Sequence, residues 1–407
     1  MNENSENNGP IYTGLLENWE RNTQNISERE ICEWKERIKK VLHSFGIEVL
    51  SISATPQLSV TYYEVIPVPG FCFLELKEHL VDFAISLGEF SARTIVPVFG
   101  KVAIGIEIPN KKQYYVSAKE LFASDSFTKS MAILPIALGK THSNQYHVTD
   151  LTELNHILIA GATGTGKSIC LKTILTGLLC KKNVSELKLV LIDPKKVEFN
   201  EFASLNSNFF AKEKSIDSNI ITDIKQSARM LDALKKEMDK RYDLLKKTTT
   251  NNIEEYNKQQ TKEGNDGLYQ RMPYIVVIID EFGDLMMTSR NEVEYSLRML
   301  AALSHKVGIH LIMATQRPTN DIVTGGILAL FSTHLVFKMS SSYDSERIIG
   351  QSDASFLIGN GDMFISNPSE DIIRSQGAYI SDEEISRIVN EINKHFKYSD
   401  SNNYYLP

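Results

Sequence analysis

The feature that most constrains the fold of this chain is a glycine-rich segment set between two apolar segments. Residues 161–168 read Gly-Ala-Thr-Gly-Thr-Gly-Lys-Ser and match the pattern GxxxxGK[ST]. The apolar run 156–160 precedes them, and leucine and isoleucine recur at helical spacing over 171–179. This order predicts a buried strand, a tight loop and a helix. A random chain of this length and average composition contains the pattern in about one case in 100, so a glycine-rich turn without a ligand is the weaker interpretation.

A loop of this kind is suited to holding phosphate groups. Its glycines allow backbone N–H groups to turn inward, and the helix that follows presents the positive end of its dipole. Lys167 brings a positive charge to the β- and γ-phosphates, and the Ser168 hydroxyl can ligate Mg²⁺. We therefore expect ATP and Mg²⁺ as ligands. The expected ATP-binding residues are Gly161, Ala162, Thr163, Gly164, Thr165, Gly166, Lys167 and Ser168.

A second segment is a strongly apolar run that ends in two acids. Residues 274–279 read Tyr-Ile-Val-Val-Ile-Ile and are followed by Asp280 and Glu281. Apolar strands often end in acids, but downstream of a phosphate loop this pair fits a defined chemistry. The first acid suits Mg²⁺ coordination through water, and the second suits the general base that polarises an attacking water. We assign these roles to Asp280 and Glu281, and we expect Asp284 to be a solvated loop acid.

Two further apolar runs end in polar residues. The run 309–314 leads into Thr315 and Gln316, and a polar residue at the tip of a strand beside the phosphate loop can sense the γ-phosphate. We assign this role to Gln316 and count it with Lys167 and Glu281 as catalytic; an ordinary polar residue at a strand end is the alternative. The segment Asp-Pro-Lys at 193–195 is expected to face either the nucleotide or a neighbouring subunit.

Short apolar runs alternate with helical patterns through much of the chain. Runs without polar alternation are typical of strands buried on both faces of a mostly parallel sheet; they occur at 157–160, 187–192, 274–280, 309–315 and 335–339. The predicted fold class is α/β, with a RecA-like P-loop NTPase core preceded by a small α+β domain. The predicted divisions are a flexible acidic tail (1–27), the small domain (28–140), the motor domain (141–395) and a C-terminal tail (396–407).

Local patterns predict individual elements within these divisions. In the small domain the expected elements are a helix over 28–46 with Ser27 as its N-cap, strands over 58–66 and 102–108, and a helix over 74–87 between those strands. In the motor domain we expect a long helix over 218–247 and then a polar loop over 248–271.

The composition restricts where partners bind and where the protein resides. The formal net charge is −7, whereas nucleic-acid-coating proteins are usually basic, so any DNA contact must be confined to a local patch or channel. The four cysteines show no CxxC spacing, which favours reduced, buried thiols over zinc ligands or disulfides. Neither a signal peptide nor a bilayer-spanning apolar run is visible. We therefore expect a cytoplasmic protein, which only a membrane-bound partner could tether.

Taken together, these segments resemble the motor region of the FtsK/SpoIIIE family of DNA translocases. The resemblance covers about residues 30–395 and rests on HILIAGATGTGKS (156–168), LVLIDPKKVEF (189–199), MPYIVVIIDEFGDLMM (272–287), GIHLIMATQRP (308–318) and GNGDMF (359–364), and in the small domain on YYEVIPVPG (62–70) and GKVAIGIEIPN (100–110). It implies a homo-oligomeric ring, with a hexamer expected, that threads double-stranded DNA through its centre. Such a ring moves along DNA by hydrolysing ATP, in chromosome partition at cell division or in DNA transfer.

The chain also departs from the usual pattern of this family. Family members usually carry membrane helices upstream and, downstream, a winged-helix domain that reads orienting DNA sequences, and we expect neither here. Usual basic positions are occupied by Ala329 and His334, which weakens the expected grip on phosphates and leaves few side chains, such as Lys338, to bind DNA. A ring places ATP between subunits and so implies an arginine finger, for which the candidates are Arg347 and Arg298.

Two alternative functions remain open on the sequence alone. The first is a related ring ATPase of a conjugative coupling or protein secretion system. The second is an ATP-binding assembly module without motor activity, against which the intact Lys167, Ser168, Asp280 and Glu281 argue. The resemblance of the small domain favours double-stranded DNA as the polymer that is moved.

Overall fold

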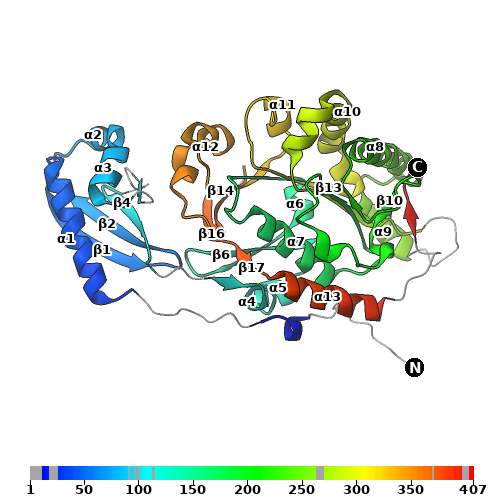
Figure 1. Ribbon diagram of the computed structural model, residues 1–407, viewed down its shortest axis with the longest axis horizontal. Helices are drawn as coiled ribbons and strands as arrows, with labels where there is room; N and C mark the ends of the chain where they lie inside the picture. Colours follow the sequence, from blue (N-terminus) through cyan, green and yellow to red (C-terminus); the bar gives the residue numbers. More distant parts are fainter. Residues whose placement is uncertain are drawn as a thin grey trace.

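A ten-stranded sheet forms the centre of the larger of two domains in the computed structural model (Figure 1). The structure describes residues 12–17, 26–89, 92–95, 98, 101–111, 115–262, 270–368, 371–396 and 403–407. In spatial order the strands are β11 (Ile220–Ile221), β9 (Leu187–Ile192), β12 (Tyr274–Ile279), β13 (Ile309–Thr315), β8 (Ile157–Ala160), β14 (Thr333–Phe337), β15 (Asp362–Ser366), β16 (Ile373–Gln376), β6 (Pro135–Thr141) and β7 (Tyr146–Asp150).

The strands of this sheet fall into a parallel half and an antiparallel half. Every ladder from β11 to β14 is parallel, and every ladder from β14 to β7 is antiparallel. All residues of β8, β9, β12 and β13 are buried, because helices cover both faces of the sheet and leave no solvent-facing side for polar residues. The predicted α/β fold class is therefore confirmed, and the strands predicted at 157–160, 187–192 and 309–315 have the predicted bounds.

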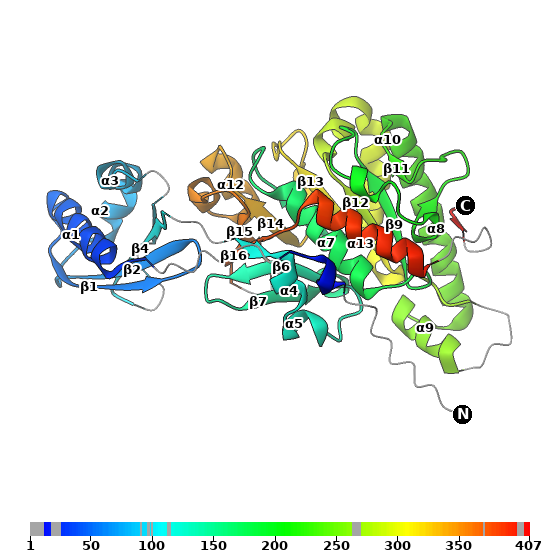
Figure 2. The same cartoon turned by 60° about the horizontal axis from the view of Figure 1, so that its bottom comes forward.

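Four long helices make the outer layers of the larger domain. They are α7 (Lys167–Lys181), α8 (Ile224–Thr248), α10 (Phe282–Leu303) and α13 (Asp382–His395). Helices α7 and α13 lie on one side of the sheet, and α8 and α10 pack against each other on the opposite side (Figures 1 and 2). The shorter helices are α4 (Ala118–Phe122), α5 (Asp125–Thr128), α6 (Leu151–Leu154), α9 (Ile253–Lys262), α11 (Gly325–Leu328) and α12 (Ser342–Ile349). Among the described residues no helix is both long and apolar enough to cross a bilayer.

The small domain has its own sheet and its own hydrophobic core. Its strands, in the order β1 (Val49–Pro56), β2 (Val60–Pro67), β4 (Ile104–Pro109) and β3 (Arg93–Ile95), are all antiparallel. Helices α1 (Glu28–Ser44), α2 (Phe73–Glu78) and α3 (Leu80–Leu87) belong to the same domain. Ser27 accepts a hydrogen bond from the Glu30 N–H and so caps α1 as predicted. The single helix predicted over 74–87 is wrong, because the helix is interrupted at His79.

The division between the two domains lies earlier than the predicted residue 140. Residues from Val116 onward, including α4, α5 and β6, belong to the core of the larger domain, and β6 is a strand of its sheet. The prediction failed because the strand β6 joins its sheet only through the antiparallel partners β16 and β7, a pairing that local sequence patterns do not reveal.

Segments predicted as tails or loops also contribute to the larger domain. Tyr12 and Leu16 are buried in its core, and Arg387 of α13 donates to the Leu15 carbonyl and pairs with Glu17. At the other terminus β18 (Tyr404–Tyr405) pairs with β10 (Ala211–Lys212). These parts of the predicted tails are therefore packed, while the rest of both tails (1–11, 18–25 and 397–402) lies outside the described residues.

Two further predictions are wrong in part. The polar loop predicted over 248–271 contains α9, on which Tyr256 is buried, whereas residues 263–269 lie outside the described part of the chain. Helical periodicity in α9 is hidden by its polar composition, because only one narrow face contacts the core. The prediction of four buried cysteines is also wrong in part: Cys170 and Cys180 are buried, but Cys32 and Cys72 are exposed.

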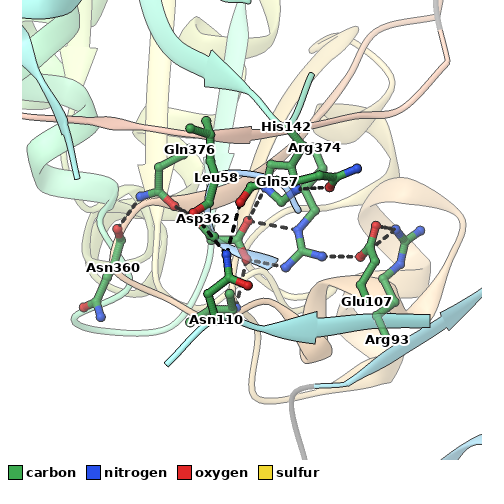
Figure 3. Close-up of polar contacts among 12 residues, drawn as sticks. Gln57, Leu58, Arg93, Glu107, Asn110, His142, Asn360, Asp362, Arg374 and Gln376 are labelled. Carbon is green, nitrogen blue, oxygen red and sulfur yellow. Dashed lines mark hydrogen bonds and ion pairs between the residues drawn. The ribbon is translucent and has the colours of Figure 1, made fainter. Parts of the chain in front are cut away.

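A buried network of charges joins the two domains (Figure 3). The Arg374 guanidinium in β16 pairs with Asp362 of β15 at 2.6 Å and with Glu107 of the small domain. Arg93 of the small domain pairs with Glu107 at 3.4 Å and with Asp353 of the larger domain at 2.6 Å. Burial by itself would raise the pKa of Asp362, but the adjacent Arg374 outweighs burial and holds that pKa below its ordinary value.

Acidification should destabilise the protein through two histidines buried between β8 and β13. His156 accepts a hydrogen bond from the Leu311 N–H at 3.0 Å, and His310 donates to the Asn155 carbonyl at 2.8 Å. Burial, with a smaller repulsion between the rings, lowers the pKa of His156 to about 3, and burial lowers that of His310 to about 4. Because histidines in the unfolded chain titrate near 6.5, the unfolded state takes up more protons as the pH falls from roughly 6.5 to 4.

We therefore expect the free energy of unfolding to fall over this range, by up to about 1.4 kcal/mol per pH unit for each histidine. Urea unfolding at several pH values measures the slope. The double variant His156→Gln, His310→Gln should have a shallower slope, and an unchanged slope would contradict the assignment.

Removal of Arg374 should be costly because it leaves two carboxylates buried without their main partner. We expect Arg374→Leu to lower the free energy of unfolding by about 3–5 kcal/mol in urea. The double variant Arg374→Leu, Asp362→Leu should recover part of the loss, since it removes a buried charge of each sign. Arg29→Leu is the control: it breaks the ion pair with Glu33, whose side chains are 89% and 61% exposed, and should cost less than about 1 kcal/mol. Equal losses in the two single variants would contradict a role for burial.

Candidate nucleotide-binding site

The glycine-rich loop lies between β8 and α7, in the strand–loop–helix setting predicted from the sequence. β8 ends at Ala160 and α7 begins at Lys167, so residues 161–166 make the turn. Gly161, Gly164 and Gly166 all have positive φ angles. At Gly166 (φ 117°) a Cβ atom would also lie 2.7 Å from the Gly361 nitrogen, so conformation and space both require glycine there.

The polar residues of the loop are held by contacts within the site. The Lys167 ammonium is buried and donates to the Ala162 carbonyl at 2.7 Å. Burial lowers the pKa of Lys167 to about 8, although the nearby acids oppose this shift. The Thr165 hydroxyl donates to the same carbonyl, and the Thr163 hydroxyl donates to Gln316 at 2.7 Å. The structure therefore places Gln316 beside the loop.

The first of the two predicted acids, Asp280, follows β12 and is almost completely buried. Burial raises the pKa of its carboxyl to about 7, with further contributions from Glu198, Asp193 and Glu281. The negative charge of these acids is thus incompletely compensated, and a divalent cation bound here would neutralise it.

The residues predicted to hold Mg²⁺ have suitable chemistry but would not enclose the ion. Ser168 and Asp280 carry a hydroxyl and a carboxylate, which are the kinds of oxygen ligand that a hard cation prefers. Within the described parts of the chain no group of three or more histidine, cysteine or acidic side chains could hold a metal ion. A magnesium ion would therefore depend on phosphate oxygens and water for the rest of its coordination.

The second acid, Glu281, is buried and held in one orientation by several donors. The Thr315 hydroxyl donates to it at 2.9 Å, the Gln316 N–H at 3.3 Å and the Gly283 N–H at 3.2 Å. The Lys195 ammonium forms an ion pair with it at 3.1 Å. A carboxylate fixed in this way can accept a hydrogen bond from a water without first having to reorient.

In the segment 193–195, Asp193 and Lys195 make different contacts, which the sequence pattern did not distinguish. Asp193 accepts hydrogen bonds from the backbone N–H groups of Lys196, Val197 and Glu198 and so fixes the turn after β9. Lys195 reaches across to Glu281. The sequence placed this segment at a strand end, but only the parallel pairing of β9 with β12 brings Lys195 to the acid.

A cavity of about 440 Å³ opens beside the loop. Its lining joins the phosphate loop to residues from other parts of the chain: Tyr115, Thr163, Gly164, Gly166, Lys167, Ser168, Ile169, Cys170, Glu198, Gln316, Asn360, Gly361, Gly377, Ala378 and Tyr379. Asp280 and Glu281 are absent from this lining, and Glu281 reaches it through its hydrogen bond with Gln316. The sequence did not identify Tyr115, Glu198 or Tyr379 as site residues, since no motif marks them.

A turn at residues 359–361 supports the loop and connects it to the small domain. The Gly361 N–H donates to the Thr165 carbonyl at 2.9 Å. Gln376 donates to the Asn360 carbonyl at 2.7 Å and accepts a hydrogen bond from Ser59 of the small domain at 2.9 Å (Figure 3). A chain of contacts through Gly361, Asn360 and Gln376 therefore connects the phosphate loop to the small domain.

Neither arginine-finger candidate lines the cavity of its own chain. The Arg298 side chain is exposed and lies beside Gly326. Arg347 donates to the Val323 carbonyl at 2.9 Å, and its Nε and Nη2 atoms are buried without a partner among the described residues. Both arginines thus lie at the segment 323–326, outside the lining of the cavity.

Comparisons with known proteins identify the relatives of this chain. The family described as FtsK/SpoIIIE matches residues 118–320, and the FtsK alpha domain matches residues 12–110. The chain is 38% identical over 378 residues to the DNA translocase FtsK of Oceanobacillus iheyensis, covering 92% of this chain and 47% of that protein. It is 35% identical over 381 residues to the DNA translocase SpoIIIE of Bacillus subtilis, covering 93% and 47% respectively. The chain therefore spans about half the length of these curated relatives.

Solved structures share the fold of this chain. The pCW3 conjugation coupling protein TcpA, in a monomer form with ATPγS, is 22% identical with a TM-score of 0.60, covering 89% of this chain and 99% of that one. The cytoplasmic domain of the type VII secretion ATPase EccC of Thermomonospora curvata is 22% identical with a TM-score of 0.57, covering 69% and 34%. At this identity the likeness supports the P-loop ATPase fold alone. From the sequence matches we conclude that the chain belongs to the FtsK/SpoIIIE family.

Proposed function

We propose that this chain is an ATP-dependent translocase of double-stranded DNA that works as a homo-oligomeric ring, in DNA segregation or transfer. The observation that carries the proposal is Glu281, a buried carboxylate oriented by Thr315, Gln316 and Lys195 next to a phosphate loop. That arrangement suits hydrolysis rather than binding alone. The names of the relatives, which are DNA translocases, support DNA as the substrate.

Each site residue has a task in the proposed reaction. The loop N–H groups and Lys167 bind and neutralise the phosphates of ATP. Ser168 and, through water, Asp280 would hold Mg²⁺, which when bound neutralises charge that develops on the phosphate oxygens. Glu281 orients the attacking water and accepts its proton. Gln316 contacts both Thr163 of the loop and Glu281, so its position can report whether a γ-phosphate is present.

A ring, for which we propose six subunits, is supported by the positions of the two arginines. Both lie away from the cavity of their own chain, as an arginine finger that acts on a neighbouring subunit requires. Arg298 is exposed, whereas the Nε and Nη2 atoms of Arg347 are buried and its Nη1 already donates to Val323. We therefore propose Arg298 as the finger in preference to Arg347.

The test of this function is whether duplex DNA stimulates ATP hydrolysis. We expect the turnover rate of the wild-type chain to rise on addition of long duplex DNA, and the protein to displace a third strand from a triplex. Glu281→Gln should lower kcat by about 10²–10⁴-fold while nucleotide binding, measured by calorimetry, is retained. Asp284→Asn, a change at the next acid along the chain, is the control and should leave turnover near that of the wild type.

No stimulation by duplexes of any length would overturn the translocase function. Hydrolysis without DNA stimulation would then favour a ring ATPase of a coupling or secretion system. Equal turnover by the wild type and Glu281→Gln would show that Glu281 is not the base and would favour an ATP-binding assembly module.

Mixing of inactive variants tests whether a finger acts between subunits. Arg298→Ala and Lys167→Ala should each be inactive alone, with the loss of the finger costing about 10³-fold or more. Mixed in equal amounts, they should recover activity, because some interfaces then combine an intact loop with an intact arginine. Arg347→Ala should retain turnover. Arg298 is not the finger if Arg298→Ala is active alone. If Arg347→Ala is inactive alone and recovers activity when mixed with Lys167→Ala, Arg347 is the finger instead.

A further inference from the structure

The phosphate loop explains only one end of the cavity. Lys167, Ser168, Gln316 and Glu198 line the part that would receive phosphates and metal. The lining also includes uncharged residues from the first turn of α7 and from two segments outside that helix: Tyr115, Ile169, Cys170, Gly377, Ala378 and Tyr379. Burial raises the pKa of the Cys170 thiol to about 12, so that this side chain is neutral as well. An uncharged extension of a phosphate site suits the apolar, planar part of a ligand.

Two short paired strands position the aromatic rings of Tyr115 and Tyr379 in the uncharged part of the cavity. β5 (Val116–Ser117) and β17 (Ala378–Tyr379) are parallel, with Val116 opposite Ala378 and Ser117 opposite Tyr379. Val116 and Ala378 are buried in the core. Because successive side chains alternate between the faces of a strand, Tyr115 and Tyr379 lie on the other face, where both line the cavity.

The strand that carries Tyr379 is fixed against the nucleotide loop and its helix. Thr173 of α7 donates to the Ala378 carbonyl at 3.2 Å, and the Gly377 N–H donates to the Gly361 carbonyl at 2.8 Å. Gly377 is opposite Tyr115 if the register is continued by one residue, and a Cβ atom there would lie 3.2 Å from the Gly361 oxygen. The absence of a side chain at Gly377 therefore allows this close approach.

We propose that Tyr379, assisted by Tyr115, forms a stacking site for the purine base of the bound nucleotide. This inference rests on the proposed function, because it assumes that the loop holds a nucleoside triphosphate. Aromatic rings and bases stack through their faces with little dependence on hydrogen bonding. Tyr115 directly precedes the first strand of the larger domain, so the site also brings the base to the connection with the small domain.

The inference predicts that the base and the phosphates contribute separately to binding. We propose to measure, by calorimetry with Mg²⁺, the Kd of ATP and the Kd of inorganic tripolyphosphate, which lacks the base. In Tyr379→Ala the Kd of ATP should rise about tenfold, so the ratio of the tripolyphosphate Kd to the ATP Kd should fall about tenfold, while the Kd of tripolyphosphate itself is unchanged. Tyr379→Phe, which keeps the ring, should retain the wild-type ratio. Both ligands are measured on the same sample, so partial unfolding of a variant does not alter the ratio.

Tyr295→Ala is the matched control, because Tyr295 lies on α10, is 61% exposed and does not line the cavity. Photolabelling with 8-azido-ATP provides a second readout, in which labelled peptides should contain Tyr115 or Tyr379. A wild-type ratio in the double variant Tyr115→Ala, Tyr379→Ala, or labelling confined to other segments, would overturn the base site. If Tyr379→Ala loses the preference for ATP over tripolyphosphate and duplex DNA does not stimulate hydrolysis by the wild type, the base site is supported and the translocase function is overturned.

Discussion

Parallel hydrogen bonding among four neighbouring strands decides where every candidate catalytic residue lies. β8 pairs with β13 and β14, and β13 pairs with β12. Parallel strands place their carboxyl ends at one edge of a sheet, where ligands of α/β proteins bind. The phosphate loop after β8, the acids after β12 and Gln316 after β13 therefore meet, although they are far apart in the sequence. The same rule brings Lys195, which follows β9, to Glu281.

Adjacent acids acquire different properties at this edge because their surroundings differ. Glu281 is surrounded by donors from Thr315, Gln316 and Lys195, which fix its orientation. Asp280 is buried near other acids, so its pKa rises to about 7. A carboxylate with a fixed orientation is suited to act as a general base. A carboxyl group surrounded by other acids is suited to bind a cation, which compensates the negative charge. These different surroundings support the separate roles that we propose for the two neighbouring acids.

Charge pairing also determines how the small domain is attached. Arg374 is buried between Asp362 of its own domain and Glu107 of the small domain, and Asp362 follows directly after the turn that supports the phosphate loop. Buried ions of this kind require their partners, since an unpaired charge is strongly unfavourable away from water. The interface is thereby specified by a few residues that adjoin the nucleotide site.

Sequence patterns determined those elements whose conformation depends on the residues within the element itself. The apolar runs 187–192 and 309–315 became strands with the predicted bounds, because continuous apolar sequence requires burial on both faces. Residues 161–166 became the loop because Gly161, Gly164 and Gly166 tolerate its positive φ angles. Only the tertiary structure decided the partners of these elements. It placed β6 in the large sheet, Tyr12 and Leu16 in the core, and Tyr115 beside Tyr379 at the cavity. Contacts between residues distant in sequence arise from the packing of whole elements, and the amino acids at those positions carry no local pattern that reveals them.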